Sequence, residues 1–259
     1  MKQIFRLKEY LRYLVRARGL DNLHPPFAYD FAANVLHDKR MFYAYAEIEA
    51  QREKLLRSQQ RIAVHDSGSR SGTAIEKTVS SLAKKSLKPA KQAQLLFRIA
   101  DRYGAGNILE FGTSLGITTL YLASASKKSR VISLEGNPLL LDLAQQQINK
   151  LGIQNITLKQ GDFGETLLPA LQQLVTVDFI FFDGNHHKIP TLQYFREALP
   201  FKNENSIFVF DDIYWSEEMK ESWEEIKSHE EVRLTIDLYY FGIVFFRKEL
   251  SKQHFTLRF

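Results

Sequence analysis

Hydrophobic and polar positions follow two patterns along the chain, and the change between them falls near residue 104. Before it, apolar residues recur every three or four positions, which is typical of amphipathic helices. A stretch rich in Ser and Gly over 65–73 interrupts this pattern and predicts a loop. The spacing predicts helices over about 3–18, from near residue 27, over 40–59, over 74–84 with a cap at Thr73 or a neighbour, and over 89–103.

After residue 107 short apolar runs alternate with helical spacings. Strands joined by helices imply parallel pairing, right-handed crossovers and a sheet that is covered on both faces. The expected strands are 108–111, 131–134, 156–158, 177–182 and 207–210, and the expected helices are 116–124, 137–151, 164–174, 189–199 and 216–228.

The end of the chain departs from this alternation. Residues 232–239 and 242–247 are β-like, and the few residues between them allow only antiparallel pairing. We therefore predict an α/β fold with a Rossmann-like doubly wound sheet, mostly parallel with a C-terminal antiparallel hairpin, plus an N-terminal helical region. We divide the chain into a helical cap region, 1–87, and an α/β domain, 88–259.

Composition narrows the possible classes of protein. The 259 residues are 44% hydrophobic, which excludes disordered and low-complexity chains. The chain has no cysteine, so disulfides, zinc ribbons, iron–sulfur sites and thiol nucleophiles are excluded, and a reducing, cytoplasmic location is expected. No apolar run approaches the roughly 20 residues of a transmembrane helix.

Charge divides the chain close to the change in pattern. Residues 1–104 carry 20 Lys and Arg against 10 Asp and Glu, whereas residues 105–259 carry 15 against 20. The first predicted helix is basic and amphipathic, which suits attachment to an anionic membrane surface or to nucleic acid. We favour the more usual arrangement, in which the apolar stripe of this helix packs on the rest of the protein.

Acidic residues and glycines follow the first predicted strands, where ligands bind in a doubly wound sheet. Glycines 112 and 116 allow a sharp turn and a close approach to a ligand, and the acid before them, Glu110, suits a ligand that bears an ammonium group. After the second strand, Glu135 can accept both hydroxyls of a ribose. After the third, Asp162 either takes an adenine amino group or caps a helix, and Phe163 can pack on the ring.

These motifs resemble those of class I S-adenosylmethionine-dependent methyltransferases, most closely the catechol-type, metal-dependent O-methyltransferases, from about residue 90 to the C-terminus. The family's acid-and-glycine loop is matched by 110–118, its ribose-binding acid by Glu135 and its adenine-side motif by 161–163. The resemblance identifies 88–259 as a class I methyltransferase domain. It implies that S-adenosylmethionine is bound by Glu110, Gly112, Thr113, Ser114, Gly116, Thr118, Glu135, Asp162, Phe163 and Asp183.

Three further acids follow the fourth and fifth strands. We expect adjacent strands to bring Asp183, Asp211 and Asp212 together with no Lys or Arg nearby, so a cation is expected to neutralise them. Oxygen ligands suit Mg²⁺, Mn²⁺ or Ca²⁺. Metal-dependent relatives carry Asp-Asn after the fifth strand, whereas this chain has Asp-Asp. Either the added charge strengthens cation binding, or only one acid of the pair coordinates.

A histidine follows three residues after the first of these acids. The catechol enzymes of the family carry a proton-accepting lysine there, and this chain carries His186. Imidazole side chains titrate near neutral pH, so we predict catalytic roles for His186, as the base, and for Asp183. Two alternatives stay open: His186 or His187 is a fourth metal ligand, or His186 orders the loop.

The resemblance implies O-methylation of a small-molecule hydroxyl assisted by a divalent metal. Alternatives are a metal-independent methyltransferase acting on a sugar, lipid or small acid, an RNA methyltransferase, and a non-enzymatic binding module. Nucleic acid is disfavoured, because the amine-methylating Asn/Asp-Pro-Pro-Tyr motif and the cysteine of cytosine-C5 chemistry are both absent and the basic residues are scattered. A homodimer is a candidate assembly.

Aromatic residues are the candidates for covering the site. Trp215 is the preferred wall of the pocket, with Tyr214, Tyr239 and Tyr240 near its mouth. The loop 65–73 either orders on ligand binding or is an ordinary linker. A second group lines a lid or, as we favour, belongs to the helical region's own core: Phe27, Tyr29, Phe31, Phe42, Tyr43 and Tyr45.

Overall fold

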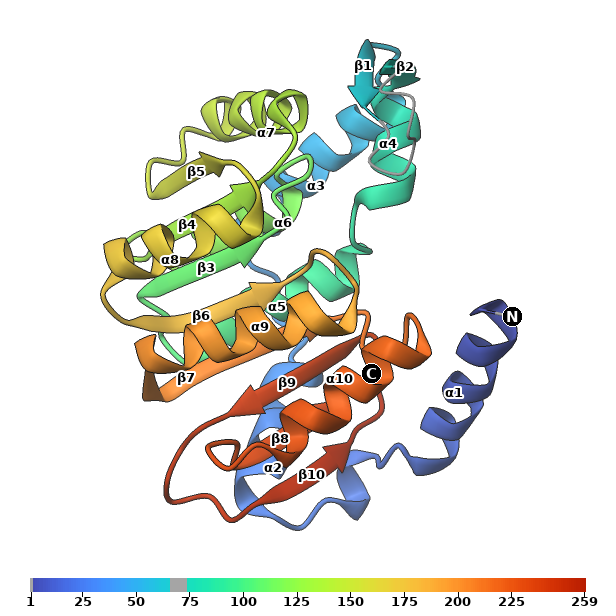
Figure 1. The fold of residues 1–259 in the computed structure, drawn as a ribbon, viewed down its shortest axis with the longest axis vertical. Helices are drawn as coiled ribbons and strands as arrows, with labels where there is room; N and C mark the ends of the chain where they lie inside the picture. The colour runs from blue at the N-terminus through green and yellow to red at the C-terminus, as the bar shows by residue number, and fades with distance from the viewer. Residues whose placement is uncertain (1, 66–73) are drawn as a thin grey trace.

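A computed structural model describes residues 2–65 and 74–259, and its centre is an eight-stranded sheet in the order β10-β8-β9-β7-β6-β3-β4-β5 (Figure 1). The strands β3 to β7 pair in parallel, and β9 runs antiparallel to both β7 and β8. The predicted sheet and its C-terminal hairpin are therefore confirmed. The strands are β3 (Asn107–Phe111), β4 (Arg130–Glu135), β5 (Ile156–Gln160), β6 (Val177–Phe182), β7 (Lys202–Asp211), β8 (Leu234–Asp237), β9 (Phe241–Phe245) and β10 (Gln253–Thr256).

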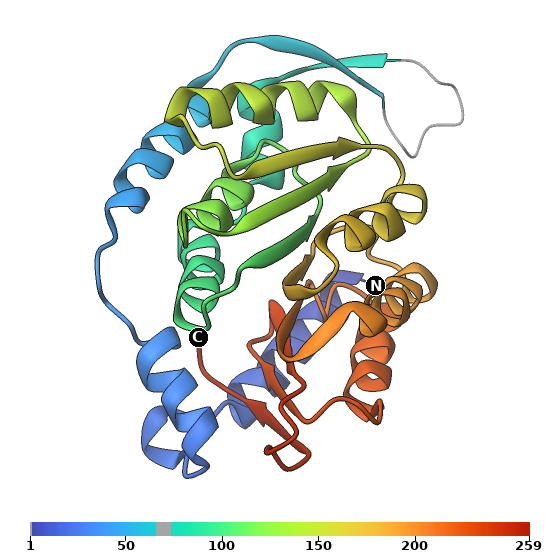
Figure 2. The same cartoon turned by 90° about the vertical axis from the view of Figure 1, so that its left-hand side faces the viewer.

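Helices cover both faces of this sheet, and Figure 2 shows the sheet between the two layers. In β6, Phe179 and Phe181 face one layer while Ile180 and Phe182 face the other, which explains why the strands read as continuous apolar runs. One layer contains α2 (Pro26–Phe31), η2 (Ala32–Leu36), α5 (Ala90–Arg102) and α6 (Ile117–Ser124), with α7 (Pro138–Leu151) beside α6. The other contains α8 (Phe163–Leu174), α9 (Lys188–Ala198) and α10 (Glu217–Ser228), and η3 (Leu199–Phe201) follows α9.

The N-terminal region is not wholly helical. It contains α1 (Lys2–Arg16), η1 (Leu20–Asn22), α3 (Tyr43–Arg57), β1 (Arg61–His65), β2 (Ala74–Thr78) and α4 (Val79–Ser86).

The predicted helix over 74–84 is wrong in its first half. Residues 74–78 pair antiparallel with β1, and the helix begins at Val79, where Thr78 Oγ1 accepts the amide of Ser81 at 3.2 Å. The strand depends on a partner that lies beyond the reach of local spacing. The predicted cap at Thr73 and residues 66–73 of the predicted loop lie outside those that the structure describes, whereas residue 65, the first of that loop, ends β1. The short strand β10, parallel to β8, was not predicted.

The N-terminal helices share the core of the α/β part. Phe31 is buried in the same cluster as Phe245, and Tyr45 is buried in the same cluster as Leu120. Phe27 and Phe42 are partly buried and pack against the same two clusters, whereas Tyr29 and Tyr43 are exposed. The buried aromatic residues therefore belong to a core shared with the α/β part, and the favoured placement in a core of the helical region's own is wrong. The division at residue 87 stays a prediction. Among the described residues, no helix combines the length and apolar content that crossing a membrane requires.

Candidate active site

The site lies where β3 separates β4 from β6, at the carboxyl ends of these strands, which is the position where the strand order reverses and ligands bind. Gly112, directly after β3, has a φ of 85°, and a Cβ there would lie 2.3 Å from the carbonyl oxygen of Asp183. Only glycine therefore fits where the loop after β3 touches the loop after β6. This contact joins the cofactor motif to the acids that follow the fourth strand.

Glu110 is fully buried at the end of β3. Its Oε2 accepts hydrogen bonds from Thr119 Oγ1 at 2.5 Å and from Ser133 Oγ at 2.6 Å, and Thr113 Oγ1 lies 2.6 Å from the same serine oxygen. Its Oε1 has no partner among the described residues. Burial raises the pKa of Glu110 to about 8, against the lowering effect of the two hydroxyls. Glu110 thus keeps one oxygen available for a proton or a cationic group.

Glu135, at the end of β4, fixes the backbone around it. One carboxylate oxygen accepts the amide of Ser114 at 2.8 Å, and the other accepts the amide of Asn137 at 2.9 Å. Each oxygen retains a lone pair, so the predicted ribose contact is compatible with these bonds. Gly116, with a φ of 82°, precedes α6, and Thr118 is half-buried in the first turn of that helix.

Asp162 and Phe163 begin α8. Asp162 caps the helix by accepting the amide of Gly164 at 2.8 Å, which is the alternative that the sequence left open. The ring of Phe163 lies against Gly184, where a Cβ would approach it to 2.4 Å. The predicted adenine contacts of these two residues stay predictions, and the packing of Phe163 brings α8 against the loop that carries Asp183.

The acids after β6 and β7 meet around a lysine. Lys88 Nζ lies 3.2 Å from Asp183 Oδ1 and forms a shorter ion pair with Asp211 Oδ2. Burial opposes the charged form of Lys88, but the carboxylates of Asp211, Asp183 and Asp212 outweigh it and raise the pKa of the ammonium. The expectation that no basic group lies near these acids is therefore wrong.

Lys88 reaches the acids from the segment between α4 and α5. Its carbonyl oxygen accepts a hydrogen bond from the Arg52 guanidinium at 2.6 Å, and Arg52 in turn pairs with Glu49 on α3 at 2.9 Å. The helices before the α/β part thus fix the position of this lysine. No sequence motif identifies the contact between Lys88 and Asp211, because 123 residues separate them.

A metal ion would have a different ligand set from the one predicted. Ligand atoms of Asp183, Asp211 and His186 lie within 4.8 Å of one another, and Asp212 does not belong to this group. The two carboxylates suit Mg²⁺ or Mn²⁺, whereas an imidazole ligand is more typical of Zn²⁺ or Fe²⁺. However, the same two carboxylates already contact the Lys88 ammonium, so these residues fit a metal only if Lys88 moves away.

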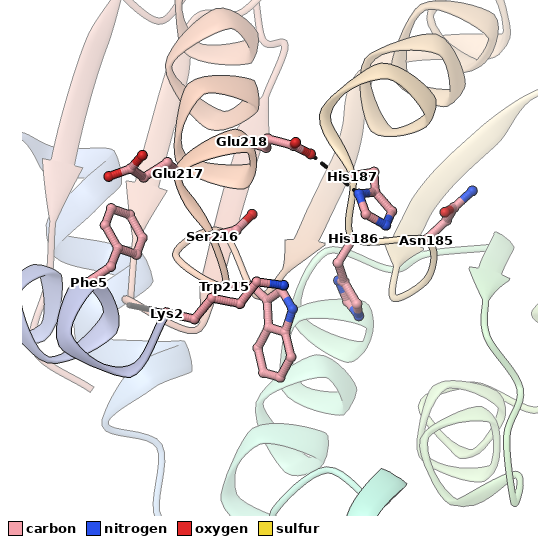
Figure 3. A pocket seen from close by; sticks show the side chains of 9 residues that line it. All are labelled: Lys2, Phe5, Asn185, His186, His187, Trp215, Ser216, Glu217 and Glu218. Carbon is pink, nitrogen blue, oxygen red and sulfur yellow. Dashed lines mark hydrogen bonds and ion pairs between the residues drawn. The ribbon is translucent and has the colours of Figure 1, made fainter. Parts of the chain in front are cut away.

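His186 connects this cluster to a cavity of about 640 Å³. The imidazole Nε2 lies 3.9 Å from Asp183 Oδ1, and the ring centroid lies 6.1 Å from that of Trp215. Figure 3 shows the indole of Trp215 between the side chains of α1 and the ring of His186. The preferred wall residue is therefore in the cavity, and its other lining residues are Lys2, Phe5, Asn185, His187, Ser216, Glu217 and Glu218.

Two cavity features were not predicted from the sequence. Lys2 and Phe5 reach the cavity from α1, and the Arg6 guanidinium lies 4.4 Å over the Trp215 ring. His187 points to Glu218, with Nδ1 3.4 Å from a carboxylate oxygen, and does not belong to the possible metal-ligand group. The basic first helix therefore contributes directly to the wall of the cavity.

Comparisons with known proteins agree with this arrangement. Residues 109–213 match a family described as "Methyltransferase domain". Over 129 residues the chain is 32% identical to a catechol O-methyltransferase of Niastella koreensis, covering 47% of this chain and 56% of that protein. A catechol O-methyltransferase of Mycobacterium tuberculosis is 28% identical over 131 residues, covering 48% and 56%.

Solved structures share the fold. A Podospora anserina methyltransferase with bound S-adenosylhomocysteine has a TM-score of 0.61 at 14% identity, covering 87% of this chain and 97% of that one. This chain spans little more than half of the length of the two catechol O-methyltransferases that it matches.

Proposed function

We propose that this chain, a class I S-adenosylmethionine-dependent methyltransferase that resembles the catechol type, methylates a hydroxyl group of a small molecule. The observation that carries the proposal is the contact between the loop after β3 and the backbone at Asp183. Three residues after Asp183, His186 lines the cavity. The loop suited to the cofactor is therefore in contact with the loop that carries the residues suited to a substrate.

The residues around β3 and β4 fit the cofactor. The free oxygen of buried Glu110 suits the ammonium group of S-adenosylmethionine, and Glu135 would accept its ribose hydroxyls. Asp162 and Phe163 would lie on the adenine side. When bound, the cofactor supplies an activated methyl group on a sulfonium, so the protein needs chiefly to position and deprotonate the hydroxyl.

His186 is the proposed proton acceptor. Its half-buried imidazole is open to the cavity on one side and lies 3.9 Å from Asp183 Oδ1 on the other. In this position it could take the proton of a hydroxyl, while the Asp183 carboxylate stabilises the imidazolium that forms.

The cation beside the hydroxyl has two candidates. Asp183 and Asp211 would hold a divalent ion, whose chemistry when bound is to lower the pKa of a hydroxyl, and His186 would remain the proton acceptor as long as it stays outside the ligand set. The contacts of Lys88 with both carboxylates favour a second candidate, metal-independent transfer, in which the lysine ammonium supplies the positive charge.

The first experiment separates binding of the cofactor from turnover. S-adenosylhomocysteine is titrated by calorimetry into the wild type and His186→Gln, and methyl transfer from tritiated S-adenosylmethionine is measured on catechols, sugars and small acids. We expect cofactor affinity within about twofold and turnover at least 100-fold lower in the variant, in line with general-base catalysis. Absent cofactor binding would contradict the proposal and favour a binding module, and transfer confined to RNA would favour an RNA methyltransferase.

The second experiment separates the two cations. If Lys88 supplies the charge, EDTA leaves turnover unchanged and Lys88→Met lowers it. If Asp183 and Asp211 hold a metal, EDTA abolishes turnover and Mg²⁺ restores it. Lys85→Met is the matched control, because Lys85 is exposed on the neighbouring helix α4.

A further inference from the structure

We propose that the outer face of α1 is a docking surface for an anionic lipid bilayer. Five apolar side chains of this helix point away from the protein and are among its most exposed large hydrophobic groups, from 38% to 88% exposed. The expectation that this stripe packs on the rest of the protein is wrong. The stripe consists of Ile4, Leu7, Leu11, Leu14 and Val15.

The opposite face of α1 attaches the helix to the protein. Tyr13 Oη donates to the carbonyl oxygen of Leu257 at 2.8 Å, and Tyr239 Oη donates to the carbonyl oxygen of Arg6 at 2.9 Å. Glu9 is buried and pairs with Lys220 of α10 at 3.1 Å. Polar and aromatic contacts therefore hold the helix, and the apolar stripe is left for another surface. In Figure 1, α1 lies at the periphery beside the C-terminal strands.

The charges beside the stripe indicate an anionic partner. Lys8, Arg12 and Arg16 border the same surface. The only acidic residue of the helix, Glu9, is buried and pairs with Arg12 at 2.5 Å as well as with Lys220, so Lys8 and Arg16, both exposed, are the charges available to an anionic partner. An apolar stripe with basic flanks is typical of helices that lie in the plane of a membrane. The 15 residues of α1 span roughly 22 Å, so the helix would lie along the bilayer surface.

The other occupants fit this face less well. A second copy would place the same basic residues opposite one another, and five side chains are few beside the roughly 20–30 residues per partner of a stable interface. Nucleic acid would neutralise the charges but would leave the apolar stripe in water. A bilayer with anionic headgroups satisfies both parts of the surface.

The position of α1 gives this docking a consequence for the substrate. Lys2 and Phe5 belong to the same helix and line the cavity beside Trp215. Docking would therefore place the cavity next to the bilayer, where an amphiphilic hydroxylated substrate partitions. This consequence rests on the proposed function, whereas docking itself is measured without turnover.

The test is co-sedimentation of the full chain with vesicles of phosphatidylcholine alone and with 30% phosphatidylserine. We expect strong binding only to the anionic vesicles and a decrease as salt is added. Leu7→Gln/Leu11→Gln should weaken binding at least tenfold, while Ile189→Gln, which changes an exposed side chain on α9, is the apolar control. Lys8→Gln/Arg16→Gln should weaken binding about fivefold for each charge removed, with Lys127→Gln/Lys128→Gln as the charge control.

Circular dichroism and S-adenosylhomocysteine binding verify that each variant is folded. The proposal is overturned by equal binding to both vesicles, or by no binding. It is also overturned if light scattering shows a dimer that Leu7→Gln/Leu11→Gln dissociates, since a second copy would then cover the face. Tight RNA binding that is insensitive to the leucine changes would overturn it as well. Loss of cofactor binding in the wild type would contradict the proposed function and leave the vesicle result intact.

Discussion

Two pairs of carboxylates lie at the same edge of the sheet and are neutralised in different ways. Glu110 and Glu135 accept hydrogen bonds from hydroxyl and backbone N–H groups, from partners no more than 23 residues away in the sequence. Asp183 and Asp211 share the ammonium of Lys88, which lies 123 residues before Asp211. The first pair is stabilised by dipoles and the second by a full charge.

This difference separates the tasks of the two pairs. Dipoles leave the charge or the proton of a carboxyl group available, so Glu110 and Glu135 can still receive a cationic or hydroxylated ligand. A fixed ammonium competes with any second cation, so Asp183 and Asp211 are suited to holding one positive charge beside a reacting hydroxyl. Removing the ammonium from the second pair, and replacing each carboxyl group of the first pair by an amide, tests the distinction.

The largest effect is expected from Lys88→Met. The change leaves the buried carboxylate of Asp211 and the half-buried one of Asp183 side by side without the lysine ammonium, and breaking a buried ion pair costs about 3–5 kcal/mol. Urea denaturation at pH 7 measures the loss of unfolding free energy. Mg²⁺ should restore part of it, because the freed oxygens would then bind the ion.

The control for this change is Lys85→Met, which alters an exposed lysine and should stay within about 0.5 kcal/mol of the wild type. A loss below 1 kcal/mol for Lys88→Met would show that the second pair does not depend on the lysine. The contrast between the two carboxylate pairs would then disappear.

The next effect concerns the buried acid of the first pair. Burial raises the pKa of Glu110 from the usual 4.5 to about 8, with the charges of Asp183 and Glu135 facing it. Between these pH values the folded protein keeps a proton that the unfolded chain releases, so stability falls as pH rises, by up to about 1.4 kcal/mol per pH unit.

Glu110→Gln removes this proton and should flatten the fall in unfolding free energy between pH 5 and 8. Part of the slope remains, because burial also raises the pKa of Asp211 and of Asp237. Denaturation midpoints at four pH values measure both slopes. Parallel curves for the wild type and the variant would mean that Glu110 is ionised throughout this range.

The same contrast explains how much could be predicted from the sequence. The strands β3 to β9, the helices between them and the residues of the first pair follow from spacing and local motifs, because their partners are close along the chain. The Thr78 cap and the strand β2 were missed, since β2 exists only through its pairing with β1. The spacing of apolar residues within one segment cannot reveal that the segment pairs with a strand elsewhere in the chain.

The contacts of Lys88 and the exposed face of α1 were missed for a related reason. A lysine before Pro89 carries no sign that its side chain reaches acids more than 90 residues away. The apolar stripe of α1 was expected to face inward, but Glu9 and Tyr13 make the inward contacts. The pattern identified an amphipathic helix but did not show which face of that helix would pack on the rest of the protein.

The smallest effect is expected from Glu135→Gln. An amide side chain offers one acceptor oxygen where the carboxylate offers two, so one of the bonds to the Ser114 and Asn137 amides is lost, at about 1 kcal/mol. S-adenosylhomocysteine affinity should fall about tenfold, because the acceptor for a ribose hydroxyl is lost with the charge. Calorimetry measures the affinity, and Glu204→Gln, at an exposed position of β7, is the control. If stability falls and affinity does not, Glu135 only orders the loop, and the cofactor's ribose is recognised by other groups.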